Sequence, residues 1–165
     1  MLDIPHLSQN GEGADARRND CGAACVAMIV GGLTNGSPTV DDIAIRFQSK
    51  PNEYMYFGEL LTALRSYGLD AGYKRPLFIS DIMTAIEAGR PMIALVKYPL
   101  MPRQFAVFTG YHFIVLYGYV GDSIIYHDPL SAGYEYLLIS AKELDKAMSD
   151  YSLAENLPYQ GIVAG

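Results

Sequence analysis

The stretch Cys21-Gly22-Ala23-Ala24-Cys25-Val26-Ala27-Met28-Ile29-Val30 decides the fold of this chain. Its residues are small or apolar on every side of a helical wheel, which is typical of a helix buried all round. The pair Gly31-Gly32 follows directly and is predicted to end this helix. We therefore expect a buried helix over residues 21–30 that stops at the glycine pair.

The residues after this helix first favour further helices and then favour strands. Capping and apolar spacing predict helices from Thr39 to about Phe47 with Asp42 as reciprocal cap, from Phe57 to Tyr67 ended by Gly68, and from Ser80 to Ala88 capped by Ser80. Short β-branched and aromatic runs predict strands at Met92–Val96, Phe113–Tyr119, Ile124–His127 and Tyr134–Ile139. A last helix is predicted from Ser140, where Ser-Ala-Lys-Glu reads as a capping box.

This order of elements predicts an α+β fold, with an N-terminal helical half packed on a C-terminal antiparallel sheet. No internal repeat, low-complexity tract or linker-like change of composition divides the sequence. We therefore expect residues 1–165 to form one domain. A chain of this length buries enough surface to make a core without a disulfide or metal staple.

Composition and charge exclude several classes of protein. The 165 residues include 12 Lys and Arg against 18 Asp and Glu, a net charge of −6. An acidic chain of this kind argues against a nucleic-acid partner or an anionic membrane surface, because phosphate binding needs clustered basic side chains. No apolar run is long enough for a membrane span, and the first residues lack the pattern of a signal peptide. The expected location is cytoplasmic by default, unless the chain is cut from a longer secreted protein.

The two cysteines, Cys21 and Cys25, raise the question of a reactive thiol. Cys21 is predicted in the first turn of the buried helix, where unpaired backbone N–H groups and the helix dipole stabilise a thiolate and can also stabilise an oxyanion. The alternative is that Cys21 is one more small core residue. Cys25, one turn further on, is predicted to be a packing residue. The two thiols do not have the spacing of a zinc site, and no metal is expected.

A nucleophilic cysteine needs a base and a group that orients this base, and His112 and Asp128 are candidates. If residues 119–121 form a three-residue hairpin loop, Asp128 falls opposite His112 on the same face, with β-carbons about 4.5–5.5 Å apart. A two-residue turn at Gly121-Asp122 would instead place the two side chains on opposite faces. In the favoured register His127 has the opposite parity and cannot share that face.

Several motifs in order resemble the papain-like bacterial cysteine peptidases related to the bacteriocin leader-processing family. They are Ile4-Pro5-His6-Leu7-Ser8-Gln9, Arg18-Asn19-Asp20-Cys21-Gly22-Ala23-Ala24-Cys25, Tyr67-Gly68-Leu69, Gly89-Arg90-Pro91, Gly110-Tyr111-His112-Phe113-Ile114-Val115 and Asp128-Pro129. Together they cover nearly the whole chain. The resemblance implies a papain-like peptidase fold, a polypeptide substrate, and no metal or organic cofactor.

The resemblance also implies a role for each matching residue. Cys21 would be the nucleophile, His112 its general base and later acid, and Asp128 the group that orients the imidazole. Gln9 would supply a side-chain amide to the oxyanion hole beside the backbone N–H of Cys21. Gln9 lies further before the cysteine than is usual in the family, and Gly11 to Asp15 read as a loop insertion.

Other interpretations stay open at this point. Gln9 could be a solvated loop residue, with Asn10 or Asn19 in its place. The same thioester chemistry serves acyl transfer or the hydrolysis of cell-wall peptides. The chain could also be a catalytically silent peptide-binding module, with Tyr54, Tyr56, Phe57 and Tyr98 as aromatic contacts. The sequence does not decide the oligomeric state or the cleavage specificity.

Overall fold

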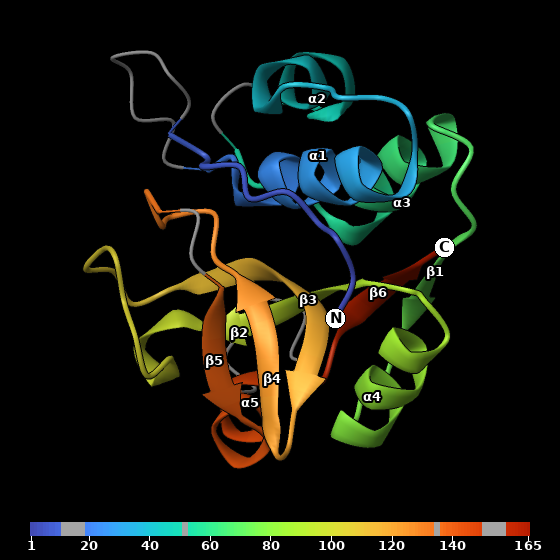
Figure 1. Cartoon of the computed structure of the whole chain (residues 1–165). Coiled ribbons are helices and arrows are strands. Elements are labelled where there is room, and N and C mark those ends of the chain that lie inside the picture. The colour runs from blue at the N-terminus through green and yellow to red at the C-terminus, as the bar shows by residue number, and fades with distance from the viewer. Residues whose placement is uncertain (11–18, 51–52, 134–135, 150–157) are drawn as a thin grey trace.

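A six-stranded antiparallel sheet organises the molecule, seen in a computed structural model that describes residues 1–10, 19–50, 53–133, 136–149 and 158–165 (Figure 1). The strands lie in the order β1-β6-β2-β3-β4-β5. Their bounds are β1 Ala71–Lys74, β2 Met92–Lys97, β3 Tyr111–Val120, β4 Ser123–His127, β5 Leu137–Ser140 and β6 Gly161–Ala164, with a short 3-10 turn η1 at Tyr98–Leu100.

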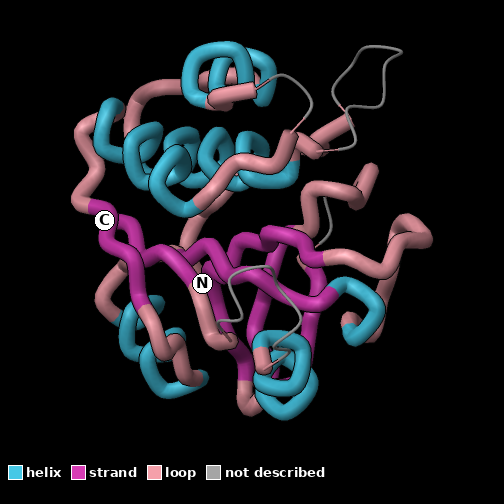
Figure 2. Tube along the Cα trace, turned by 180° about the vertical axis from the view of Figure 1, so that it is seen from behind, coloured by secondary structure: helices cyan, strands magenta, loops and turns pink. Residues whose placement is uncertain are grey.

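Helices cover both faces of this sheet (Figures 1 and 2). On one face lie α1 Cys21–Leu33, α2 Val40–Phe47 and α3 Phe57–Ser66, and on the other lie α4 Ile79–Glu87 and α5 Ala141–Met148. Alternate residues of β3 serve the two apolar cores, Phe113 and Val115 on the first face, Ile114 and Leu116 on the second. The expected α+β class is confirmed, and the sheet lies between two helical layers rather than under one.

The central helix α1 does not stop at Gly31-Gly32 as predicted but continues to Leu33. The glycines instead allow the N-terminal segment to cross the helix. A β-carbon on Gly32 would clash with Ile4 Cδ1 and lie 2.9 Å from the carbonyl oxygen of Asp3. The pair is therefore a site of close packing between two chain segments.

Capping explains where most helices begin. The reciprocal bonds between Thr39 and Asp42 are present, with Asp42 N–H to Thr39 Oγ1 at 3.1 Å, and Ser140 caps α5 as predicted. The predicted cap of α4 at Ser80 is wrong. That helix begins at Ile79, because the Asp81 carboxylate accepts the backbone N–H of Phe78.

Two short strands, β1 and β6, were absent from the sequence expectations. Both contain glycine, and β6 lies between β1 and β2, one strand in from the edge that β1 forms. The strand expected at 134–139 is observed as β5, and residues 134 and 135 lie outside the described residues. Within the described ranges, the helices are all too short or too polar to cross a bilayer.

Candidate active site

The β3–β4 hairpin decides whether His112 and Asp128 can meet. Val120 pairs with Ser123, so the turn consists of Gly121 and Asp122, and Gly121 has a φ of 55°. The predicted three-residue loop is therefore wrong. The two-residue turn that would separate the two side chains is the one observed.

A β-bulge further along the hairpin brings them back to one face. Gly118 pairs with Ile125, but Leu116 pairs with Tyr126, so Tyr117 is an extra residue in β3. The carbonyl oxygen of Tyr117 accepts the backbone N–H of Leu2 at 2.9 Å. Because one extra residue reverses the alternation of side chains, the bulge cancels the effect of the shorter turn.

His112 and Asp128 therefore interact, although diagonally and not as directly opposed residues. His112 Nε2 donates to Asp128 Oδ1 at 2.6 Å, and the side chains are 2% and 0% exposed. The same Oδ1 accepts the backbone N–H of Leu130 at 2.8 Å. The carboxylate therefore holds the imidazole by one nitrogen, which leaves Nδ1 as the other nitrogen of the ring.

The surroundings of His112 favour its charged form. Burial by itself lowers the pKa of the imidazole, but the hydrogen bonds to Asp128 and to the Cys21 thiol, with the charges of both groups, raise it to about 9. The ring is thus protonated at neutral pH. The structure brings together Cys21, His112 and Asp128, three residues that lie far apart in the sequence.

Cys21 is the first residue of α1, as expected from the sequence. The Asp20 side chain does not cap this helix, and Asp20 contributes its carbonyl oxygen, which accepts the N–H of Ala24 at 2.9 Å. The thiol thus lies at the positive end of a helix of 13 residues. Cys25 is completely buried one turn away, and its pKa is raised by burial first and by Cys21 and Asp128 second. A neutral packing thiol at Cys25 agrees with these surroundings.

The segment that contains Gln9 runs beside the turn that follows Asp128. Gln9 donates its backbone N–H to the carbonyl of Pro129 at 2.8 Å, and its side chain is 3% exposed. His6 donates from Nε2 to the carbonyl oxygen of Asp128 at 3.0 Å. Gln9 is therefore a buried residue that contacts Pro129, the residue after Asp128, and not a solvated loop residue. The expected insertion at Gly11 to Asp15 lies outside the described residues.

His127 occupies a different environment on β4. It pairs with Val115 on the face opposite to Asp128, as its parity predicts. Its Nε2 donates to the carbonyl oxygen of Ile4 at 2.8 Å, and its ring stacks on Tyr117 at 4.2 Å between centroids. Burial, together with the neighbouring His6, lowers its pKa to about 4.

The four aromatic residues considered as peptide contacts do not form one group. Tyr54 and Tyr56 are exposed and Phe57 is partly buried, but Tyr98 is fully buried. The Tyr98 hydroxyl donates to Asp128 Oδ2 at 3.2 Å. The expectation for Tyr98 as a surface contact is wrong, and sequence reasoning missed its bond to Asp128. No short-range pattern reveals it, because a long loop separates Tyr98 from β3.

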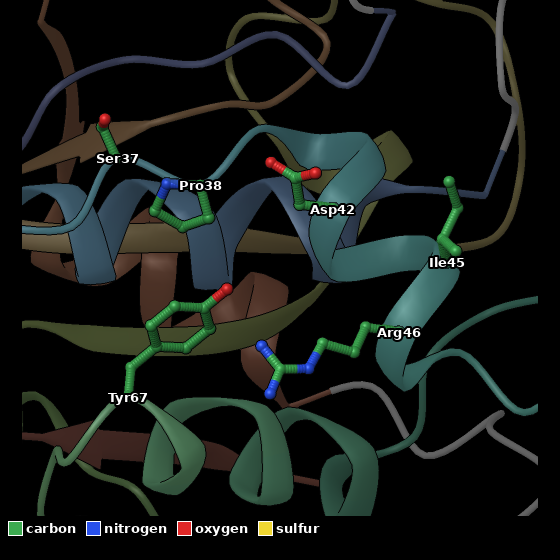
Figure 3. Close-up of a pocket in the computed structure, with 6 residues that line it drawn as sticks. All are labelled: Ser37, Pro38, Asp42, Ile45, Arg46 and Tyr67. Atoms are coloured by element: carbon green, nitrogen blue, oxygen red, sulfur yellow. The ribbon is translucent and has the colours of Figure 1, made fainter.

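A separate pocket of about 570 Å³ opens elsewhere, between the segment before α2, α2 itself and the end of α3 (Figure 3). The Tyr67 ring and the Arg46 guanidinium face each other across it. Its lining residues are Ser37, Pro38, Asp42, Ile45, Arg46 and Tyr67, and they include none of the residues around Cys21. In the part of the chain that the structure describes, no three His, Cys, Asp or Glu side chains are grouped as a metal site.

Several solved structures share this fold. A candidate C39-like peptidase from Bacillus anthracis is similar at a TM-score of 0.73 and 16% identity, over 99% of this chain and 94% of that one. The peptidase domain of Streptococcus ComA, a bi-functional ABC transporter involved in a quorum-sensing pathway, is similar at a TM-score of 0.69 and 13% identity, over 98% of each chain.

The third is a double-glycine-motif protease from an AMS/PCAT transporter in complex with its leader peptide, at a TM-score of 0.62 and 19% identity, over 99% of this chain and 91% of that one. A search of curated proteins gave no match. The sequence family described as the Peptidase_C39 like family matches residues 1–152. Its fold and its family suggest a cysteine peptidase, and the chain belongs to the Peptidase_C39-like family.

Proposed function

We propose that this protein is a cysteine peptidase that hydrolyses a peptide amide bond through a thioester on Cys21. The observation that carries the proposal is the buried 2.6 Å bond from His112 Nε2 to Asp128 Oδ1, on an imidazole that also interacts with Cys21. A protonated imidazole stabilises a neighbouring thiolate by its charge, and the start of α1 adds the helix dipole. We further propose that residues 1–165 form one domain, because β6 lies between β1 and β2.

The proposed reaction has two stages. The Cys21 thiolate attacks the peptide carbonyl, and the backbone N–H of Cys21 and the Gln9 side chain stabilise the oxyanion. His112 then gives its proton to the leaving amine, which departs and leaves the acyl group on sulfur. In the second stage His112 accepts a proton from water, whose oxygen attacks the thioester, and the acid product leaves with the thiolate restored.

The substrate that we propose is a polypeptide. One similar structure is a protease in complex with its leader peptide, which makes a peptide substrate a reasonable choice for this chain. A peptide library that includes sequences with two adjacent glycines therefore tests the proposal directly. Products captured by an added amine in preference to water would reassign the chain as an acyltransferase.

The decisive test is the reactivity of Cys21 towards iodoacetamide, followed by tandem mass spectrometry of the peptide that contains both cysteines. Cys21 is 3% exposed and Cys25 0%. We expect Cys21 to react much faster than Cys25, and we expect His112→Ala to slow Cys21 by about 100-fold at pH 7, because the thiolate loses its partner. Equal rates in the wild type and His112→Ala would rule out the proposed mechanism.

A further inference from the structure

Tyr98 is a buried polar residue that the proposed mechanism does not use. It follows β2 directly, and its backbone N–H donates to the carbonyl of Gly110, just before β3, at 3.0 Å. Its side chain is 0% exposed. A fully buried hydroxyl needs partners, and those partners indicate what the residue does.

The Tyr98 hydroxyl makes two hydrogen bonds of different kinds. It donates to Asp128 Oδ2 at 3.2 Å, and it accepts the backbone N–H of Phe105 at 2.8 Å. Its ring stacks on Phe108 at 4.4 Å and meets the edge of His112 at 4.9 Å. Tyr98 thus contacts both members of the His–Asp pair.

The two oxygens of the Asp128 carboxylate have separate partners. Oδ1 accepts from His112 and from the backbone of Leu130, while Oδ2 accepts from Tyr98. A carboxylate held at both oxygens cannot rotate about its last bond without losing a hydrogen bond. The Tyr98 bond therefore keeps Oδ1 in line with the imidazole.

We propose that Tyr98 is a positioning residue for the reaction of Cys21, and that it ties the loop of residues 101–110 to Asp128. The proposal rests on the proposed function of His112 and Asp128. The loop is the yellow segment that projects beside the sheet in Figure 1, and Val107 in it is fully exposed. A molecule that binds this loop and moves it would shift Asp128 through the Tyr98 hydroxyl, which is bonded to both.

The electrostatics of the hydroxyl agree with a donor role. Burial raises the pKa of Tyr98 far above its ordinary value, and Asp128 raises it further, so the phenol keeps its proton at neutral pH. The donor is thus present at pH 7. The ring stacking does not depend on the hydroxyl, so Tyr98→Phe removes the bond and keeps the packing.

Tyr126→Phe is a matched control for Tyr98→Phe. Tyr126 is also fully buried and belongs to the same core, but in the described structure its hydroxyl has no hydrogen-bond partner. Both changes remove one buried phenol oxygen and leave the ring. Only Tyr98→Phe removes a bond to Asp128.

The experiment measures the pKa of His112 by NMR titration and the iodoacetamide rate at Cys21 at pH 7, on the full chain. We expect Tyr98→Phe to lower the His112 pKa by about 0.5 or more, because a carboxylate free to rotate holds the imidazole less well. The Cys21 rate should fall about 5- to 10-fold. Tyr126→Phe should leave the His112 pKa unchanged and should change the Cys21 rate by less than about 2-fold.

The outcomes separate this proposal from the proposed function. A His112 pKa that is unchanged or higher in Tyr98→Phe overturns the positioning role, and this holds even where Cys21 proves unreactive in the wild type. A reactive wild-type Cys21 that is slowed by His112→Ala but not by Tyr98→Phe supports the mechanism and overturns the role of Tyr98. Equal losses in Tyr98→Phe and Tyr126→Phe point to general core damage and also overturn it.

Discussion

The two buried histidines of the β3–β4 hairpin behave in opposite ways. Both are almost fully buried, and burial lowers the pKa of each. His112 donates to the Asp128 carboxylate and its pKa rises to about 9, while His127 donates to the carbonyl of Ile4 and its pKa falls to about 4. The charge at the candidate site thus comes from the Asp128 carboxylate and the neighbouring Cys21, and not from the position of the ring in the fold.

Removing each histidine in turn gives the sharpest test of this comparison. His112→Ala should lower kcat/KM for a cleaved library peptide by about 10²- to 10⁴-fold, because the acid and base of both stages is lost. His127→Ala should stay within about 3-fold of wild type at a temperature where the variant is folded. Similar losses in the two variants would mean that His112 has no special role.

Neutralising the carboxylate should make His112 resemble His127. In Asp128→Asn we expect the His112 pKa to fall well below about 9, because burial remains and the carboxylate is gone, while Cys21 still raises it. The Cys21 reactivity should fall by about 100-fold at pH 7. The matched control is Asp122→Asn in the exposed hairpin turn, which should leave the His112 titration unchanged.

The two histidines should limit stability on opposite sides of neutral pH. The raised pKa of His112 gives stability that is complete below pH 6.5 and is lost as the pH rises towards 9, up to about 3 kcal/mol. The lowered pKa of His127 gives stability that is present above pH 6.5 and is lost as the pH falls towards 4.

Urea unfolding of single variants across this pH range tests both predictions. His112→Gln should reduce only the loss of unfolding free energy at alkaline pH, and His127→Gln only the loss at acid pH. A variant that reduces the other loss, or both, contradicts the assignment of the two pKa values.

The smallest expected effect is on the stability of the N-terminal segment whose Ile4 carbonyl accepts the His127 hydrogen bond. A β-carbon at Gly32 would meet Ile4 and the backbone of Asp3, the segment that accepts the His127 hydrogen bond. Gly32→Ala should therefore destabilise the fold by about 1–3 kcal/mol in urea unfolding and leave the titration of His112 unchanged. Gly58→Ala is the control. A β-carbon at Gly58, in α3, would have no atom within 4 Å, so this change should be neutral or should stabilise the fold by up to about 1 kcal/mol.

Local rules predicted the local features of this chain. The reciprocal cap at Thr39, the cap at Ser140, the start of α1 at Cys21 and the strand character of 113–119 need only neighbouring residues, and all are observed. The α4 cap shows the limit of such rules: two acceptors stand next to each other, Ser80 and Asp81, and only the backbone geometry selects between them.

Features that depend on distant segments could not be predicted. Gly31-Gly32 has the pattern of a helix terminator, and its real function depends on Ile4 crossing the helix. The bond from Tyr98 to Asp128 joins segments with no common turn, so no spacing rule reaches it. The meeting of His112 and Asp128 was predicted through the wrong register, and it is nevertheless observed because of the bulge at Tyr117.

That bulge determines which changes in chain length the hairpin can accept. Deleting one residue at the bulge, or adding one to the turn, would turn Asp128 away from His112, although no catalytic side chain would be altered. Making both changes together would restore the pairing. Insertions and deletions in residues 113–127 should therefore be tolerated by the site only in compensating pairs.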